Sequence, residues 1–141
     1  MNSVVKENEK YIYYKNILND AAIYGKNAAI WACTNNLNNI QAKEIEKLNE
    51  IFESNKSNID KIELSGKSYN IEDFEPDCLI KFKNNDNDDE GVIAKIKTGY
   101  IFGLYNTKSK CKAFDQEKNQ NQVLCCDVVK GLAINLNLLG L

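Results

Sequence analysis

Three acidic residues lie close together in a segment that could supply paired carboxylates. Glu72, Asp73 and Glu75 fall within one short stretch, and two carboxylates held side by side can act as general acid and general base. Such a pair must be buried and must share a proton before its pKa values separate. The sequence around these residues indicates neither condition. We interpret the segment as a solvated loop.

Two other segments imitate ligand-binding motifs. The run Asp86-Asn87-Asp88-Asp89-Glu90-Gly91 matches the first half of a calcium-binding loop. Lys97 stands at its twelfth position, however, where a bidentate carboxylate is required. Gly66-Lys67-Ser68 resembles the end of a phosphate-binding loop, but Lys61 replaces the first glycine of that motif. The sequence favours a solvated hairpin tip for the first segment and a turn between strands for the second.

The chain has five cysteines and no histidine. Without histidine, Ser-His-Asp and Cys-His mechanisms are excluded, and a transition-metal site is disfavoured. The cysteines lack Cys-x-x-Cys spacing, so we interpret them as reduced thiols that fill small buried gaps. They are Cys33, Cys78, Cys111, Cys125 and Cys126. The sequence therefore predicts neither an enzyme nor a metal or cofactor site.

Length and composition predict one globular domain over residues 1–141, since 43% of the residues are hydrophobic. The net charge of -2 and the pI of about 5.3 exclude the basic face that nucleic-acid binding requires. The segment from Met1 to Lys10 is polar, unlike a signal peptide. No apolar run approaches the ~18 residues of a membrane span. We therefore expect a cytoplasmic protein that does not span a membrane.

Hydrophobic periodicity predicts three helices and seven strands. The helices are expected at 7–20, 41–54 and 122–139, and the strands at 21–24, 29–34, 61–64, 67–72, 78–83, 91–97 and 100–106. The short connections from residue 61 onward predict an antiparallel meander of five strands. Residues 107–121 read as a polar loop.

Trp31, the only tryptophan, is predicted to lie in the middle of the sheet, with Ile30 and Ala32 on the opposite face. The last helix has two apolar stripes, and we expect one of them to face a partner. The first stripe is Val128, Val129, Leu132, Leu136 and Leu139, and the second is Ile134, Leu138 and Leu141.

Several short motifs follow one another in a fixed order. They are Tyr11-x-x-Tyr14-x-x-x-Leu18, Ala22-Ile23-Tyr24-Gly25, Ile30-Trp31-Ala32-Cys33-Thr34, Glu44-Ile45, Leu64-Ser65-Gly66-Lys67-Ser68-Tyr69, Glu90-Gly91-Val92-Ile93, Lys97-Thr98 and Val128-Val129-x-x-Leu132-Ala133-x-x-Leu136. In this order the chain resembles profilin, a family of small actin-monomer-binding proteins, over nearly its whole length. The resemblance implies an α+β fold with a central antiparallel sheet. The first and last helices would pack on one face and the shorter helix on the other.

The resemblance also implies an aromatic groove for proline-rich segments, such as those of formin-type filament elongators. The polyproline II helix is already ordered, so flat rings can bury its prolines at little entropic cost. The groove residues implied here are Tyr11, Tyr14, Trp31, Asn135 and Leu141. Tyr11, Asn135 and Leu141 depart from the residues usual in the family, so we expect a weak or altered groove.

Monomeric actin is the main partner that the resemblance implies, with effects on polymerisation and nucleotide exchange. The implied contact residues are Asn70, Ile71, Asp73, Lys81, Lys83, Lys97, Cys126, Asp127 and Lys130. Phosphoinositides, which profilins bind through basic patches, receive little support from this acidic chain. An alternative from another class is a trafficking or sensor adaptor of similar layering, which docks a protein through its hydrophobic last helix.

Overall fold

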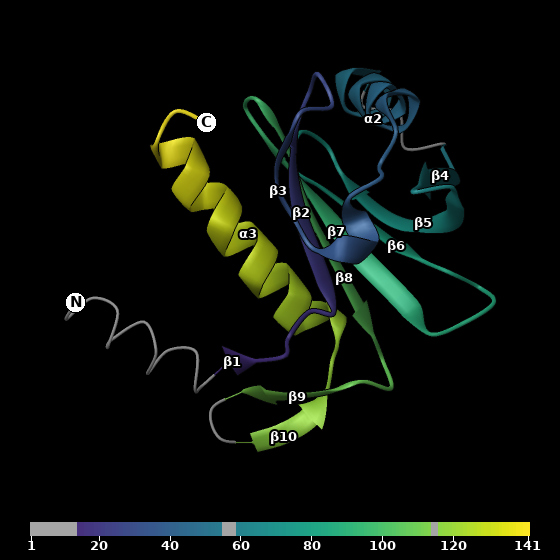
Figure 1. Cartoon of the computed structure of the whole chain (residues 1–141), viewed down its shortest axis with the longest axis vertical. Coiled ribbons are helices and arrows are strands. Elements are labelled where there is room, and N and C mark those ends of the chain that lie inside the picture. Colours follow the sequence, from purple (N-terminus) through teal and green to yellow (C-terminus); the bar gives the residue numbers. More distant parts are fainter. Residues whose placement is uncertain (1–13, 55–58, 114–115) are drawn as a thin grey trace.

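The computed structural model describes residues 14–54, 59–113 and 116–141, which fold around a curled antiparallel sheet (Figure 1). Seven strands form this sheet in the order β3-β2-β8-β7-β6-β5-β4. Their bounds are β2 Asp20–Gly25, β3 Ile30–Cys33, β4 Lys61–Leu64, β5 Lys67–Glu75, β6 Leu79–Lys83, β7 Asp89–Ile96 and β8 Gly99–Asn106. The predicted five-strand meander, β4 to β8, is confirmed.

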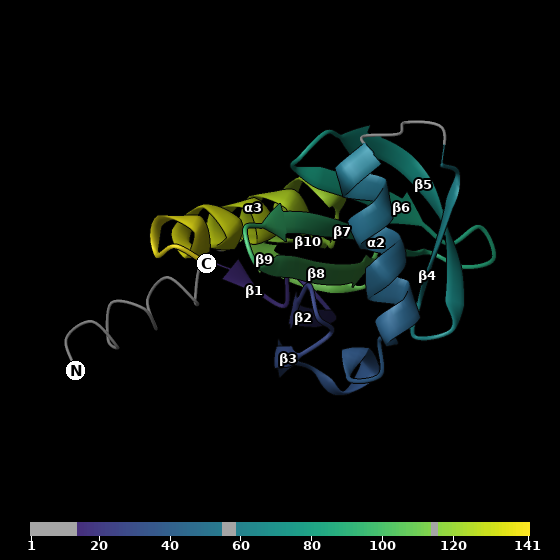
Figure 2. The same cartoon turned by 90° about the horizontal axis from the view of Figure 1, so that it is seen from above.

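Two helices cover opposite faces of the sheet, as the views in Figures 1 and 2 show. They are α2 (Ala42–Ser54) and α3 (Gln122–Leu138), and they confirm two of the predicted helices. On the α2 side, Ile45, Leu48 and Phe52 join a core that includes Tyr24 and Phe102. The α3 side has its own buried cluster, built mainly from β7, β8 and the helix. Together the layers form the expected α+β fold.

The remaining predicted helix, at 7–20, is absent where the structure describes that segment, and the prediction is wrong there. Residues Tyr14–Lys15 form the short strand β1, and Asp20 already belongs to β2. Residues 7–13 lie outside the described part of the chain. The tyrosine spacing fits a helical period, but a positive φ of 56° at Asn16 interrupts any helix at that point.

The predicted polar loop at 107–121 is also wrong, because it contains two strands. These are β9 (Lys110–Ala113) and β10 (Gln116–Asn119), and with β1 they form a small three-stranded sheet. Cys111 and Ala113 point inward against Ile17, while the alternate residues are exposed. The period-two pattern was too short and too polar to identify from sequence.

Trp31 lies on an edge strand rather than in the middle of the sheet. Ile23 pairs with Ala32 and Tyr24 pairs with Ile30, so Trp31 is the extra residue of a β-bulge. Its indole, 43% exposed, lies against Gly25, where an added Cβ would come within 3.3 Å of Nε1. The predicted alternation fails here because a bulge breaks the period of two.

The segment Gly66-Lys67-Ser68 is part of a turn between β4 and β5, as predicted. Ser65 and Gly66 both have positive φ, 53° and 78°, as in the tight turns of β-hairpins. Their amides donate to the buried Glu44 carboxylate, at 2.9 Å to Oε1 and 3.0 Å to Oε2. The amide of Gln41, which precedes α2, also donates to Oε1, at 2.8 Å. This turn therefore binds an anion, but the anion belongs to the chain itself.

Candidate functional site

Helix α3 packs on the sheet through a narrow stripe, which leaves two flanks open. The buried residues Cys125, Cys126, Val129 and Ala133 define the packed stripe. At about 100° per residue, Val128, Leu132, Asn135 and Leu139 share one flank, on the side of β2 and β3. Asp127 and Lys130 lie on the other flank, toward β6 and β5. Of the first apolar stripe, Val129 is buried while Val128, Leu132 and Leu139 are exposed; the second stripe, Ile134, Leu138 and Leu141, is exposed as well.

The flank toward β5 carries a group of charges around a buried thiol. Lys130 Nζ lies 3.6 Å from Glu75 Oε2. Burial raises the pKa of the Cys126 thiol; the ammonium groups of Lys81 and Lys130 lower it, and the carboxylates of Glu75 and Asp127 raise it. The ion pair between α3 and β5 and the pairing of β5 with β6 bring residues of these three elements together on one surface. We call these five residues, together with Glu72, Asp73 and Lys83 of the adjoining ion pairs, the charged surface.

The charged surface continues along the paired strands β5 and β6. Asp73 is the register partner of Lys81, and their charged groups lie 3.8 Å apart. Glu72 is the unpaired residue of a bulge in β5, and its carboxylate lies 3.3 Å from Lys83 Nζ. Asn70 pairs with Lys83 in the same ladder. The structure thus brings most of the predicted actin-contact residues together, whereas Ile71 packs against the core on the α2 side.

Lys97 stands apart from that group. It follows β7 at the end of the sheet opposite Lys83, roughly 16 Å along the strands from Lys81. Its backbone amide donates to Asn137 Oδ1 of α3, at 3.2 Å. The sequence order did not reveal this separation.

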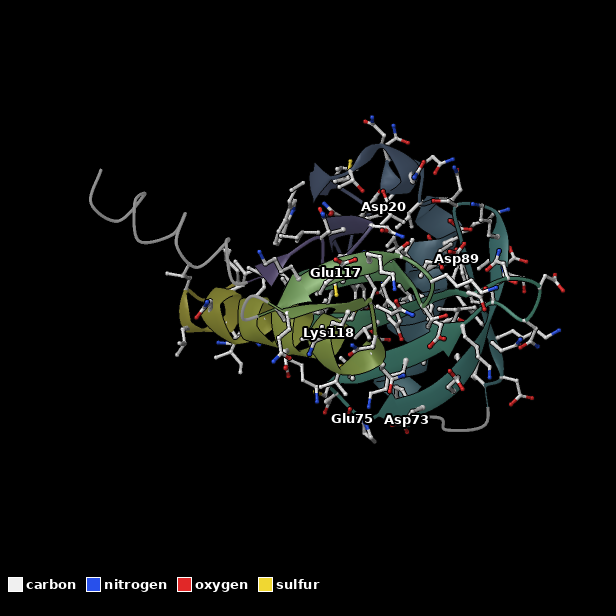
Figure 3. All side chains as sticks on the ribbon, turned by 90° about the horizontal axis from the view of Figure 1, so that it is seen from below. Asp20, Asp73, Glu75, Asp89, Glu117 and Lys118 are labelled. Carbon is white, nitrogen blue, oxygen red and sulfur yellow. The ribbon has the colours of Figure 1, made fainter. Side chains whose placement is uncertain are left out.

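The acidic segment has no paired carboxylates for acid and base work. Glu72, Asp73 and Glu75 each lie beside a different lysine, and Figure 3 shows Asp73 and Glu75 together on β5. The predicted loop is wrong, because these residues extend β5 to Glu75. In the described ranges, no three acidic or cysteine side chains gather where a metal ion could bind.

The predicted proline groove is described only in part. Tyr11 lies outside the described residues, and Tyr14 is placed through its backbone, which pairs with Ala113. Asn135 is exposed on α3, and Leu141 is 40% exposed. Val128, Leu132 and Leu139 share the flank of Asn135; the sequence placed them in an apolar stripe of this helix but not in the groove.

Trp31 and Leu141 lie at the same end of the sheet. The turn between β7 and β8 connects them: Thr98 N and Oγ1 donate to the Leu141 carbonyl at 2.8 and 2.7 Å. Lys26, in the turn after β2, donates through its amide to the Thr98 carbonyl at 2.9 Å. Gly25, which the indole of Trp31 covers, adjoins this turn. One end of the molecule therefore carries both an exposed indole and the exposed Leu141, which follows α3.

Cysteine placement agrees with the prediction at three of five positions. Cys111, Cys125 and Cys126 are buried, and burial raises the pKa of the Cys125 thiol far above its ordinary value. Cys33 and Cys78 are exposed, so they fill no buried gap. In the described part of the chain, no helix is long and apolar enough to cross a membrane.

Comparison with known structures shows the fold. Profilin IA of Acanthamoeba castellanii has a TM-score of 0.70 at 20% identity, over 89% of this chain and 90% of its own. LokiProfilin1, in a complex with rabbit actin, has a TM-score of 0.63 at 21% identity, over 98% of this chain and 91% of its own. Mouse profilin IIa, in a complex with a double repeat from the FH1 domain of mDia1, has a TM-score of 0.61 at 16% identity. The match covers 92% of this chain and 97% of its own.

Sequence comparison gives the family. A search of curated protein sequences found no significant match. The family model of profilin, by contrast, matches residues 4–141, which is nearly the whole chain. With that match, and with the fold seen in the profilins above, this protein belongs to the profilin family.

Proposed function

We propose that this profilin binds monomeric actin one to one through the charged surface. The supporting observation is the convergence of Glu75, Lys81 and Lys130, from β5, β6 and α3, on one face of the sheet. The fold is shared with a profilin whose structure contains rabbit actin. Family membership is also consistent with a protein that acts by binding, without a catalytic residue.

The chemistry of this surface suits a reversible protein contact. Lys81, Lys83 and Lys130 each lie beside a carboxylate of β5 at 3.3–3.8 Å. Partly exposed ion pairs of this kind contribute at most about 1 kcal/mol each, so a partner can exchange them for its own charges. Alternating charge also selects the partner and its orientation. Lys97, which lies apart, would contact a second region of actin.

Purified protein is expected to delay the polymerisation of pyrene-labelled actin in proportion to its concentration. One-to-one binding withdraws monomers by mass action, and the same complex is expected to alter nucleotide exchange on actin. Both effects are measured by fluorescence, with sedimentation confirming a heterodimer. If polymerisation is unchanged at protein concentrations well above that of actin, this proposal is wrong. The alternative adaptor function would then gain support, since it requires a different partner on α3.

A second proposed function is binding of proline-rich segments at the end of the sheet that carries Trp31. The observation in its favour is that Trp31 and Leu141 are both exposed and lie at the same end of the sheet, where Thr98 donates to the Leu141 carbonyl. Formin-type elongators are the proposed source of such segments. Together with actin binding, this would place the protein at the cytoskeleton in the cytoplasm.

Titration with a proline-rich peptide is expected to change Trp31 fluorescence at peptide concentrations near 1 mM, because a weak groove gives a Kd on the order of 1 mM. Prolines packed on the indole would replace water around it. A peptide with alanine at each proline is the control, since it lacks the ordered polyproline II conformation. Equal responses to both peptides, or none to either, would refute a proline groove.

A further inference from the structure

A polar pocket lies on the α2 side, away from both surfaces of α3. Its volume is about 390 Å³. The 3₁₀ helix η1 (Asn35–Leu37) covers it, and the Tyr24 hydroxyl holds η1 to the sheet by donating to the Leu37 carbonyl at 2.5 Å. Leu37, Leu64 and Leu104 supply apolar walls. Leu37 lies in η1, Leu64 on β4 and Leu104 on β8, which are distant in sequence, so the curl of the sheet creates this pocket.

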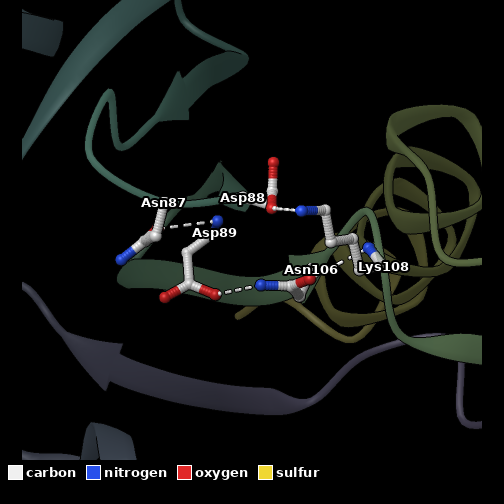
Figure 4. A network of polar contacts seen from close by, with 5 residues as sticks. All are labelled: Asn87, Asp88, Asp89, Asn106 and Lys108. Atoms are coloured by element: carbon white, nitrogen blue, oxygen red, sulfur yellow. Dashed lines mark hydrogen bonds and ion pairs between the residues drawn. The ribbon is translucent and has the colours of Figure 1, made fainter.

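Two carboxylates line the pocket, and neutral groups hold both in place. Thr34 Oγ1 and Asn36 Nδ2 donate to the Asp20 carboxylate, at 2.7 and 3.2 Å. Asn106 Nδ2 donates to Asp89 Oδ1 at 2.8 Å, as Figure 4 shows. Neutral donors fix the orientation of a carboxylate without compensating its charge.

The neighbouring ion pair in Figure 4 joins Asp88 to Lys108 at 3.1 Å and does not include Asp89. Figure 3 places Asp20 and Asp89 away from Asp73 and Glu75. Both pocket carboxylates are half-buried, so solvent screens their charges only in part.

Tyr69 directs an unpaired hydroxyl into this pocket. The residue is 4% exposed, and its ring packs edge-on against Phe82 at 4.9 Å between centroids. No described residue forms a hydrogen bond with its hydroxyl. Burial raises the pKa of Tyr69, and the carboxylates of Asp89 and Asp20 raise it further. Ser65 Oγ, which also lines the pocket, is a buried side-chain oxygen without a hydrogen-bond partner, and a ligand can supply such a missing hydrogen bond.

The charge of the pocket favours a cation. The lining side chains include two carboxylates and one ammonium, that of the exposed Lys67, which forms no ion pair with either acid among the described residues. Two carboxylates are too few for a dedicated calcium site, which takes six to eight oxygen ligands. The leucine walls suit a ligand with an alkyl portion, and the volume is at the small end for ligand sites.

We propose that this pocket binds a small alkylammonium ion. Its ammonium group would donate to Asp89, to Asp20 and to the Tyr69 hydroxyl, and its methylene chain would lie against Leu37 and Leu104. The inference does not depend on actin binding, because the charged surface shares no residue with the pocket.

Calorimetry and amide chemical shifts with cadaverine, a five-carbon diamine, test the proposal at pH 7 and low salt. We expect a Kd on the order of 1 mM, with shifts at residues 67, 69 and 89. The neutral analogue 1,5-pentanediol has the same chain length and should not bind at about ten times that concentration. Equal shifts with both compounds, or none with cadaverine, would overturn the proposal.

Single substitutions locate the binding. Asp89→Asn can still accept from Asn106 and should weaken cadaverine about tenfold. Tyr69→Phe removes only the unpaired hydroxyl, so we expect an unchanged melting temperature and about fivefold weaker binding. Lys67→Ala should strengthen binding about threefold, because a like charge is removed.

A matched control separates the pocket from general electrostatic attraction. The double variant Glu46→Gln and Glu53→Gln removes two carboxylates from the exposed face of α2. Its affinity for cadaverine should stay within about twofold. A loss as large as that of Asp89→Asn would mean that no specific site exists. Nα-acetyl-lysine methylamide carries an alkylammonium group on a peptide backbone. If it binds more tightly than cadaverine, the pocket instead binds a lysine side chain of a protein partner.

Discussion

Replacing Glu44 by alanine is expected to lower the free energy of unfolding by about 3 kcal/mol. The carboxylate is 4% exposed and accepts three amide hydrogen bonds, from Gln41, Ser65 and Gly66. Alanine would leave the amides of the turn without an acceptor in a partly buried region. The change would also disconnect the start of α2 from the turn between β4 and β5. Urea denaturation followed by circular dichroism measures the effect.

Two further variants show whether the carboxylate itself is responsible. Glu44→Gln can keep the bonds to Oε1, but its amide nitrogen would face the Gly66 amide, so we expect about half the loss. Glu46→Ala, on the exposed face of the same helix, should change stability by less than about 0.5 kcal/mol. If Glu44→Ala lowers the free energy of unfolding by no more than Glu46→Ala does, the three hydrogen bonds do not stabilise the fold.

Reversing the charges of Lys81 and Lys83 is expected to weaken actin binding about 100-fold, or about 3 kcal/mol. In the proposed interface, each lysine would meet a carboxylate of actin. The Lys81→Glu and Lys83→Glu side chains would also lie beside Asp73 and Glu72, adding to the negative charge of the surface. Fluorescence titration of labelled monomeric actin gives the affinity.

A charge-matched control lies on the other side of the molecule. Lys43→Glu with Lys47→Glu makes the same change in net charge on α2, where Lys47 also has an acidic neighbour, Glu50, at 3.7 Å. This variant should bind actin as the unmodified protein does, and both variants should keep similar melting temperatures. Equal affinity for the two variants would move the actin site away from β6.

Local sequence predicted the parts of the fold that local physics determines. Helix α2 has an apolar face, and Ser65-Gly66 adopts the turn that its small residues favour. The meander followed from connections too short for a crossover. The proline-peptide groove and the actin-contact residues rest on the family resemblance, and their roles in binding stay predictions.

Features that depend on distant residues could not be predicted. The cation pocket needs Asp20, Tyr69 and Asp89 from three strands, and only the curl of the sheet brings them together. Strand β9 is too short for its alternation to stand out, and it forms because β1 and β10 pair with it. Lys97 and Lys81 look equivalent in sequence, but Lys97 follows the end of β7 whereas Lys81 pairs with Val92 in the middle of that strand.

The bulge at Trp31 has a consequence for self-association. Strand β3 is an edge of the sheet, and a regular edge offers unpaired amides and carbonyls on which another copy can form a strand. The extra residue shifts the register of β3 after only two residue pairs, so the amides and carbonyls on its outer edge no longer alternate regularly. The irregularity that turns an apolar indole outward thus also prevents that edge from serving as a template for sheet growth between molecules.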